Sequence, residues 1–324
     1  MNKINVINFK CHRDAQNNVT IHMSQPAFVD SLLHSEKLDT PAVNPVRTPY
    51  RSGMPVDKLP ASTLSDQDQS PLTKRMQQLV GSLTWLSISM RPDIATITTM
   101  LAKYTACPTE AHLKHVQYVL RYLKGTRDMG ISFSSKHNTE LESFIKFPVG
   151  STVLPLCDAN WGPQDQSRPH PNITEQLELF KSRSLSGFLL WLQGPLHWVS
   201  KRQTMTARSS AEAEIYATDE CVKCLLHLSF LVDGLDLQNE LLPPPTTIYN
   251  DNMACIQWSS NMTTKGLRHI QIRENAVRES VSNGFAKIKH IEGKINLSDM
   301  FTKEDKDVGH FLEIRNTVMS HSPI

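Results

Sequence analysis

The chain has 324 residues, of which 39% are hydrophobic and 20% are charged, and its formal net charge is +2. These values are typical of a globular chain with a buried core and, by length, two domains. No apolar run reaches transmembrane length and the N-terminus lacks the apolar centre of a signal peptide. We therefore expect an intracellular protein with no membrane partner. Six scattered cysteines indicate reduced thiols rather than a disulfide framework.

The N-terminal part of the chain predicts three segments of different character. Alternating apolar residues on both sides of residues 15–18 predict a small hairpin, and residues 24–39 predict a short helix, so we group residues 1–39 as one segment. Residues 40–71 carry six prolines among serines and threonines, which predicts a linker or an extended connector. Helical periodicity resumes in residues 72–130.

Residues 109–124 predict an amphipathic helix with one apolar stripe and one basic stripe. Lys114 and Arg121 belong to the basic stripe, which either follows a nucleic-acid backbone or simply faces the solvent. His112 and His115 form an H-x-x-H pair without a third ligand at metal spacing. We expect both to be surface histidines.

The remaining region, 131–318, contains four carboxylates that each stand at the end of a predicted strand or the start of a predicted helix: Asp158, Glu214, Asp251 and Asp299. Four carboxylates in such positions can converge on one point, and carboxylate oxygens are the ligands of hard cations such as Mg²⁺ and Mn²⁺. Phosphodiester cleavage by two metal ions uses an acidic cluster of this kind. The pattern therefore predicts a two-metal site.

The same region predicts a mixed α/β sheet with helices on both faces. Two strands joined at Gly194-Pro195 are predicted within residues 187–203, followed by a helix at 210–235 and strands at 247–250 and 286–291. A last helix is predicted to begin near Ser298. The polar, proline-rich residues 163–178 are predicted to be an inserted loop.

A basic run lies next to the acidic residues. From Lys181 to Arg208 the sequence carries five basic residues and no acidic one. Such a patch can hold a phosphate backbone, and the alternative is a solvated basic face. Lys201 and Arg202 are the candidates that we single out.

Several motifs, in order, resemble the Pol polyprotein of copia-type LTR retrotransposons. In the C-terminal half these are CDANWG, SRSLSGFLLWLQGPLHWVSKRQ, SSAEAEIYA, IYNDNMACI, RHIQIRENAVRE and NLSDMFTK. Upstream, SQPAFVDSLL resembles the family's segment just after the reverse-transcriptase palm, and RPDIA resembles its thumb and connection region. The resemblance implies that residues 1–39 and 72–130 come from the reverse transcriptase and that 131–318 form a ribonuclease H-like domain.

The resemblance also implies an activity. Asp158, Glu214, Asp251 and Asp299 would be the DEDD set of a ribonuclease H, which hydrolyses the RNA strand of RNA–DNA hybrids with two Mg²⁺ or Mn²⁺ ions. Glu212 competes with Glu214 for the helix position, and the family motif favours Glu214. The short polar side chains of Asn160, Ser209 and Asn252 are candidates for contacts to the 2′-hydroxyls of the RNA, and the basic run would hold the DNA strand.

Two alternatives to this interpretation remain open. The chain contains no Asp-Asp dipeptide, so we expect no polymerase site and a missing palm as partner. It could then be a catalytically silent hybrid-binding or structural fragment, with Leu79, Leu83 and Leu86 exposed. A DDE transposase or integrase shares the fold, but its last acid lies on a late helix. For a retroelement protein the expected compartments are the cytoplasm, in virus-like particles, the nucleus, or both.

Overall fold

A computed structural model describes residues 7–51, 66–161, 183–260, 271–304 and 307–321. The chain divides into two compact units. The first comprises residues 1–137, 193–195 and 304–324, and the second comprises residues 138–192 and 196–303. The two units do not test the four segments predicted from the sequence, which stay predictions: 1–39, 40–71, 72–130 and 131–318.

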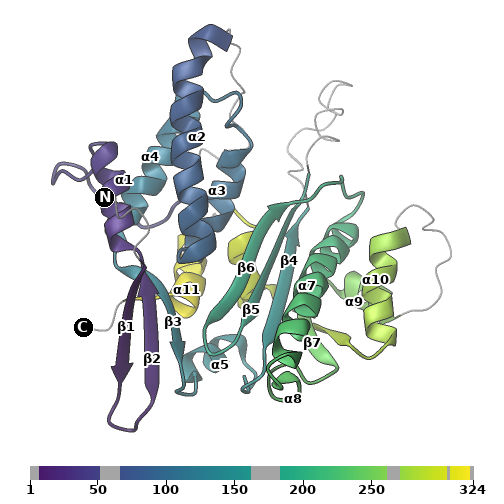
Figure 1. Ribbon diagram of the computed structural model, residues 1–324. Coiled ribbons are helices and arrows are strands. Elements are labelled where there is room, and N and C mark those ends of the chain that lie inside the picture. Colours follow the sequence, from purple (N-terminus) through teal and green to yellow (C-terminus); the bar gives the residue numbers. More distant parts are fainter. Residues whose placement is uncertain (1–6, 52–65, 162–182, 261–270, 305–306, 322–324) are drawn as a thin grey trace. The chain divides into compact units, whose positions relative to one another are not determined.

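The first unit contains a four-stranded antiparallel sheet built from β1 (Asn8–Arg13), β2 (Val19–Ser24), β3 (Met129–Ser134) and β9 (Ser320–His321), in that spatial order. The hairpin formed by β1 and β2 is the one that the N-terminal alternation predicts (Figure 1). Asn17 in its turn has a φ of 68°, a left-handed conformation that asparagine tolerates. The residues before Ile7 that also entered this prediction lie outside the described residues.

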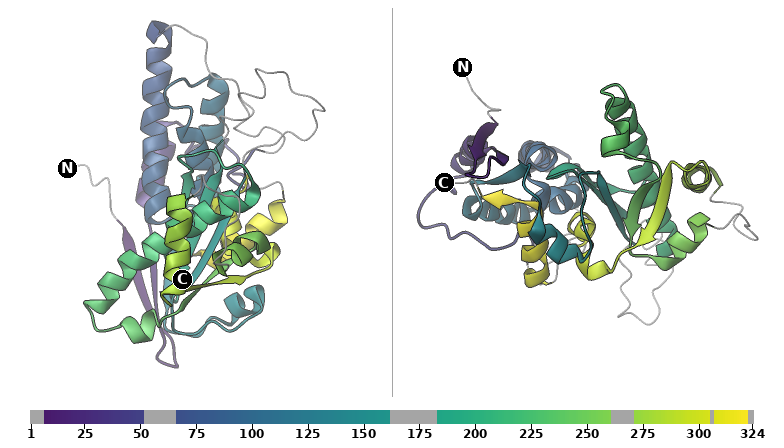
Figure 2. Two further views of the ribbon diagram at one scale, coloured as in Figure 1. Left: turned by 90° about the vertical axis from the view of Figure 1, so that its right-hand side faces the viewer. Right: turned by 90° about the horizontal axis from the view of Figure 1, so that it is seen from below.

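The helices of the first unit form its apolar core. They are α1 (Pro26–Ser35), α2 (Asp66–Ser89), α3 (Ala95–Ala102), α4 (Glu110–Gly125) and α11 (Val308–Val318), with a short 3₁₀ segment η2 (Pro92–Ile94). α2 runs alongside α3 and α4 (Figure 2). Leu79, Leu83 and Leu86 are therefore buried, and the exposure that the silent-fragment alternative expects is wrong. α2 also begins at Asp66, so the end of the predicted linker is helical.

The two histidines of α4 are buried, which contradicts the prediction of surface histidines. His112 is 0% exposed and His115 is 1% exposed. His112 Nδ1 accepts a hydrogen bond from the backbone N–H of Thr109, 3.0 Å away, at the start of the helix. Both histidines share a helix face with the buried Val116 and Val119, so helical spacing overrides their polar side chains.

The basic stripe of α4 partly serves the first unit itself. The Arg121 Nε–H group donates to the carbonyl oxygen of Asn44, 2.8 Å away. The Lys124 ammonium donates to three carbonyl oxygens of residues 38–43 at 2.6–3.1 Å. Lys114 is exposed. Arg121 and Lys124 therefore hold the connector that follows α1.

Removing the titratable ring of His115 should make the chain less sensitive to acid. Burial, assisted by the charges of Arg51 and His112, lowers the pKa of His115 from 6.5 to about 4. Stability from the neutral ring is complete above the unfolded pKa and is lost as the pH falls toward the folded one. We expect the wild-type chain to lose about 2 kcal/mol through this group between pH 7.5 and 5, and His115→Leu to lose correspondingly less.

Urea denaturation followed by circular dichroism at the two pH values measures this difference. His12→Leu, at an exposed position of the same unit, is the matched control and should behave like the wild type. An equal acid-induced loss in wild type and His115→Leu would show that another group is responsible.

The second unit is built on a five-stranded mixed sheet in the order β6-β5-β4-β7-β8. β4 is central, antiparallel to β5 and parallel to β7, and β7 is parallel to β8. These strands are β4 (Leu154–Asn160), β5 (Leu185–Trp191), β6 (Pro195–Arg202), β7 (Thr246–Asn250) and β8 (Ala286–His290). β5 to β8 lie where the sequence predicts strands, β4 ends beside Asp158 as expected, and the predicted α/β mixed sheet is confirmed.

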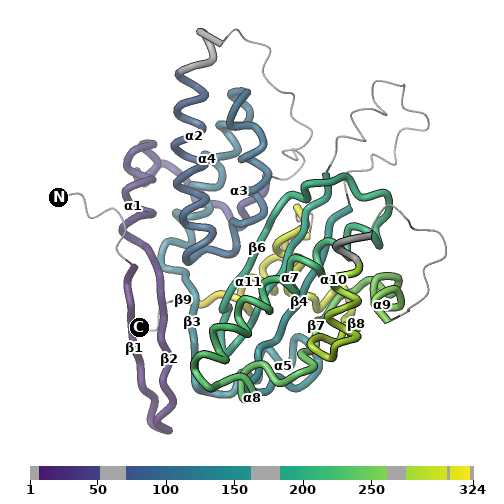
Figure 3. The backbone as a smooth tube through the Cα atoms, turned by 45° about the vertical axis from the view of Figure 1, so that its right-hand side comes forward, coloured from purple at the N-terminus to yellow at the C-terminus, as the bar shows by residue number. Residues whose placement is uncertain are grey.

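Two helices cover one face of this sheet. α7 (Ser210–Asp233) and α10 (Gln271–Ser282) lie side by side over it (Figure 3). Cys221, Val222 and Leu225 of α7 pack in one core with Phe188 and Leu190 of β5. Side chains alternate along a strand, so Gly187 of β5 belongs to the opposite face, where residues 301 and 302 pass close to it.

Short elements complete the second unit. They are α5 (Thr139–Ile145), α8 (Gln238–Leu241), α9 (Met253–Ser260) and the 3₁₀ segments η3 (Gly293–Ile295) and η4 (Leu297–Phe301). The predicted last helix near Ser298 is therefore the 3₁₀ segment η4. The predicted inserted loop at 163–178 lies outside the described residues. Among the helices that the structure describes, none combines the length and apolarity that crossing a bilayer requires.

Candidate active site

Three of the four predicted carboxylates meet at one end of the central strand. Asp158 lies near the end of β4, Glu214 lies in the second turn of α7, and Asp251 directly follows β7. Each offers an oxygen atom, and these atoms all lie within 4.8 Å of one another. Asp158 and Glu214 are buried, and Asp251 is partly exposed. Because β4 and β7 are parallel neighbours, their carboxyl ends lie next to each other, and the carboxylates of Asp158 and Asp251 meet there.

The two glutamates at the start of α7 have different partners. Ser209 is the N-cap and accepts a hydrogen bond from the Glu212 backbone N–H at 3.1 Å. The Glu212 carboxylate accepts from the Arg208 N–H at 2.6 Å and from the Tyr216 hydroxyl at 2.9 Å. Glu214 instead faces the cluster and accepts from the Asn250 amide at 3.0 Å. Glu212 therefore stabilises the helix start, and Glu214 belongs to the acidic cluster.

Asp299 lies beside the cluster on η4. The Asn296 side chain holds this segment, because its amide donates to the Cys157 carbonyl at 3.0 Å and its oxygen accepts from the Ser298 N–H at 3.2 Å. Asp299 is not among the three carboxylates within 4.8 Å of one another. It connects to them through Lys303, whose ammonium lies 2.7 Å from Asp299 Oδ1 and 3.6 Å from Asp158 Oδ1. The Thr302 hydroxyl also donates to Asp158 Oδ2.

Burial and repulsion from neighbouring charges raise the pKa values of three carboxyl groups, those of Glu214, Asp251 and Asp299. The pKa of Glu214 is raised well above its usual value by burial and then by the charges of Asp158 and Asp251. Burial and Asp158 also raise the pKa of Asp251, and they raise that of Asp299 to about 7, with Lys303 opposing both shifts. Negative charge is therefore concentrated in the cluster beyond what the protein neutralises. A buried cluster of carboxylate oxygens is compatible with binding of a divalent metal ion.

The other predicted site residues of the second unit differ from one another in burial and in hydrogen-bond partners. Asn160 is half-buried at the end of β4. The Asn252 side chain accepts from the Cys255 N–H at 3.0 Å and so caps α9, as Ser209 caps α7. Lys201 and Arg202 end β6, and the Lys201 ammonium lies 3.2 Å from Glu220.

Three further residues contact the carboxylates and are not among the predicted site residues: Asn250, Thr302 and Lys303. One signal was present, because Lys303 follows Asp299 by four residues in the motif NLSDMFTK. Lys181, the first residue of the predicted basic run, lies outside the described residues. Lys114 and Arg121 belong to the first unit.

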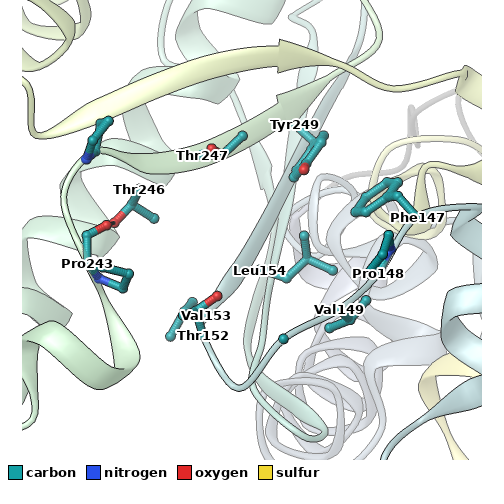
Figure 4. A pocket seen from close by; sticks show the side chains of 12 residues that line it. Phe147, Pro148, Val149, Thr152, Val153, Leu154, Pro243, Thr246, Thr247 and Tyr249 are labelled. Carbon is teal, nitrogen blue, oxygen red and sulfur yellow. Dashed lines mark hydrogen bonds between the residues drawn. The ribbon is translucent and has the colours of Figure 1, made fainter.

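A pocket of the second unit lies away from this chemistry (Figure 4). It is lined by residues before and at the start of β4, including Val149 and Leu154, and by residues before and along β7, including Thr246 and Tyr249. Phe147 stacks on Tyr249 with ring centroids 4.7 Å apart. Among the described residues that line it, none carries a carboxylate, an imidazole or a cationic group. The acidic cluster at the other end of the strands is therefore the candidate active site.

Strand order and cluster together define the class of protein: an α/β chain with a ribonuclease H-like mixed sheet and an acidic cluster at the end of its central strand. No family model matches the chain. The Retrovirus-related Pol polyprotein from transposon RE2 of Arabidopsis thaliana is 27% identical over 285 residues, which are 87% of this chain and 17% of that protein. The corresponding polyprotein from transposon TNT 1-94 of Nicotiana tabacum is 26% identical over 283 residues, 87% of this chain and 19% of that protein.

These matches confirm the resemblance to copia-type retrotransposon Pol polyproteins along most of the chain. The chain spans less than a fifth of the length of these relatives. Among solved structures, LC11-RNase H1, isolated from compost, is 13% identical with a TM-score of 0.33, covering 47% of this chain and 94% of that one. The sheet is called ribonuclease H-like because of its strand order, β6-β5-β4-β7-β8, and not because of this solved structure.

Replacing Glu214 with glutamine should stabilise the metal-free chain and remove most of its response to Mg²⁺. The neutral amide relieves the repulsion from Asp158 and Asp251, so we expect the free energy of unfolding in EDTA to rise at pH 7.5. Loss of one carboxylate should also reduce the rise in melting temperature on adding Mg²⁺.

Glu212→Gln is the matched control, two residues away on the same helix. It should lower stability by about 1 kcal/mol, because the carboxylate at the helix start loses its charge, while the response to Mg²⁺ persists. Thermal melting with EDTA and with Mg²⁺ compares the three proteins. If Glu212→Gln loses the metal response and Glu214→Gln keeps it, the assignment of the two glutamates is reversed.

Proposed function

We propose that this chain is the ribonuclease H region of a retrotransposon Pol polyprotein and hydrolyses the RNA strand of RNA–DNA hybrids with two bound Mg²⁺ or Mn²⁺ ions. The observation that carries the proposal is the convergence of oxygen atoms from Asp158, Glu214 and Asp251 within 4.8 Å of one another. Capping alone does not require three carboxylates from three elements to meet. The resemblance to Pol polyproteins supports the choice of a nucleic-acid substrate.

In this proposal the chain's own residues hold and orient the reacting groups. Asp158, Glu214 and Asp251 would ligate one cation, and Asp299 with Asp158 would ligate a second. Bound ions of this kind activate the attacking water and stabilise charge on the leaving 3′ oxygen. Asn250 keeps the Glu214 carboxylate directed at the cluster, and Thr302 fixes one oxygen of Asp158. Asn160, Ser209 and Asn252 flank the site in the sequence and would contact the RNA strand.

The rest of the polyprotein supplies the remaining partners in this proposal. Residues 1–39 and 72–130 would be reverse-transcriptase remnants that pack against the palm of the same polyprotein, with 131–318 as the nuclease domain. The first unit already buries its own apolar core, so contact with the palm would use its surface rather than its leucines. We propose the cytoplasm, in virus-like particles, and the nucleus as the compartments in which the activity operates.

Cleavage of an RNA–DNA hybrid tests the proposed activity. We expect metal-dependent cutting of the RNA strand, with Asp158→Asn and Glu214→Gln each lowering the rate at least about 10³-fold because each removes an acidic ligand. Glu212→Gln should retain most of the rate, since its partners are the helix start and Tyr216.

The measurement uses purified chain, hybrids labelled on either strand, and Mg²⁺ against EDTA. Cutting that survives in both ligand variants would reveal a contaminating nuclease. A folded chain that binds the hybrid and never cuts it would favour the alternative of a catalytically silent hybrid-binding fragment.

Removing two basic side chains from β6 should weaken hybrid binding and flatten its dependence on salt. If Lys201 and Arg202 contact phosphates, Lys201→Ala with Arg202→Ala lowers the slope of log K against log [salt] by about 1.5. Lys287→Ala with Lys289→Ala removes two exposed lysines from β8, at the opposite edge of the same sheet, and serves as the control.

Binding is measured by fluorescence anisotropy in EDTA, so that no cleavage occurs. An unchanged slope in the β6 variant, or an equal change in both variants, would reject β6 as the edge that holds the nucleic acid.

A further inference from the structure

We propose that Lys303 makes the two cation positions of the acidic cluster unequal, because its ammonium group occupies the side between Asp158 and Asp299 until a metal ion displaces it. The inference rests on the proposed metal-dependent function and adds an order of binding to it. The first ion would bind at Asp158, Glu214 and Asp251, and the second would bind in competition with Lys303.

The position of the ammonium group carries this inference. Lys303 Nζ lies 2.7 Å from Asp299 Oδ1 and 3.6 Å from Asp158 Oδ1, so it bridges the one carboxylate that lies outside the close triad to a member of that triad. An ammonium between two carboxylates neutralises the charge that a cation at the same place would use. Lys303 is therefore a positioning residue for the metals and not a ligand.

Glu214 and Asp251 differ from Asp158 and Asp299 in the cationic side chains within their reach. Among the residues that the structure describes, no lysine or arginine lies within ion-pair distance of Glu214 or Asp251. Glu214 is held by the neutral amide of Asn250. A divalent ion that binds the triad therefore displaces no ion pair of Glu214 or Asp251, whereas an ion bound by Asp158 and Asp299 must separate both from Lys303.

The Lys303 side chain is also free to change its conformation. Its side chain is 42% exposed, whereas those of Asp158 and Asp299 are 1% and 9% exposed. A lysine has a flexible four-carbon stem that can withdraw its ammonium into water, while the buried carboxylates stay in place. Displacement therefore needs a change of one side chain and no change in the strand or the 3₁₀ segment that carry the acids.

Mn²⁺ binding to metal-free protein tests the inference without measuring activity. We expect two classes of Mn²⁺ site in the wild type. In Lys303→Met the weaker class should tighten about 10-fold or more and the tighter class should change less than about 3-fold, since the ammonium is closest to Asp299 and acts on Glu214 and Asp251 only from outside ion-pair distance. Lys303→Arg keeps the charge and should keep the weak class weak. Lys287→Met removes an exposed lysine of β8 and should leave both classes unchanged.

Calorimetric titration and the electron paramagnetic resonance signal of free Mn²⁺ give both affinities, and melting in EDTA confirms that each variant is folded. Equal affinities in wild type and Lys303→Met, or a weaker second class in Lys303→Met, would overturn the inference and leave the nuclease proposal intact. A folded wild-type chain that binds no Mn²⁺ would overturn the proposed metal-dependent function itself.

Discussion

The second unit depends on holding like charges together where water cannot fully solvate them. Asp158 and Glu214 are buried, and the oxygens of the triad lie within 4.8 Å of one another. In water such groups would separate, but β4 lies in the centre of the sheet and α7 is fixed by its apolar core with β5. The packing energy of the unit therefore maintains an electrostatically unfavourable arrangement, and the raised pKa of Glu214 is its direct consequence.

A missing side chain allows the fourth carboxylate to approach. Gly187 pairs with Asp158 across β5 and β4, and a Cβ atom at Gly187 would lie 2.7 Å from both Phe301 Cβ and Thr302 Cγ2. Any larger residue would push the end of η4 away from the sheet. The glycine therefore serves close packing, and the Thr302 hydroxyl and Lys303 ammonium reach Asp158 because the backbone can lie on the strand at this point.

Much of the fold could be predicted because, in the second unit, the local sequence signals agree with the tertiary structure. Its strands are short apolar runs that end in turns, and α7 combines a serine cap with helical spacing, so local signals and tertiary structure agree. The convergence of Asp158, Glu214 and Asp251 also follows from their places at element ends. The choice between Glu212 and Glu214 did not, because both lie near the same helix start, and the family resemblance was needed to decide it.

The expectations that the structure contradicts have physical causes. His112 and His115 were assigned to the surface by residue type, whereas their spacing with Val116 and Val119 places them on the buried face of α4. The alternative of a catalytically silent fragment leaves Leu79, Leu83 and Leu86 exposed, but α3 and α4 cover them within the same unit. Lys303 was missed because the short 3₁₀ segment, rather than a regular helix, decides which carboxylates its long side chain reaches.

The hydrogen bonds and neighbouring charges of each acidic residue distinguish carboxylates that stabilise the fold from those that can react. Glu212 receives two hydrogen bonds from groups of its own helix start, so the fold satisfies it completely and gains from its charge. Glu214, two residues later, also has hydrogen bonds, from the Asn250 amide and the Ala159 backbone, but it bears the repulsion of Asp158 and Asp251. Lys303 forms direct ion pairs only with Asp158 and Asp299 among the four carboxylates, and it does so with a side chain that solvent can reach. A carboxylate that the protein leaves under-compensated is one that can accept an external cation, and the fold concentrates such carboxylates at one end of β4.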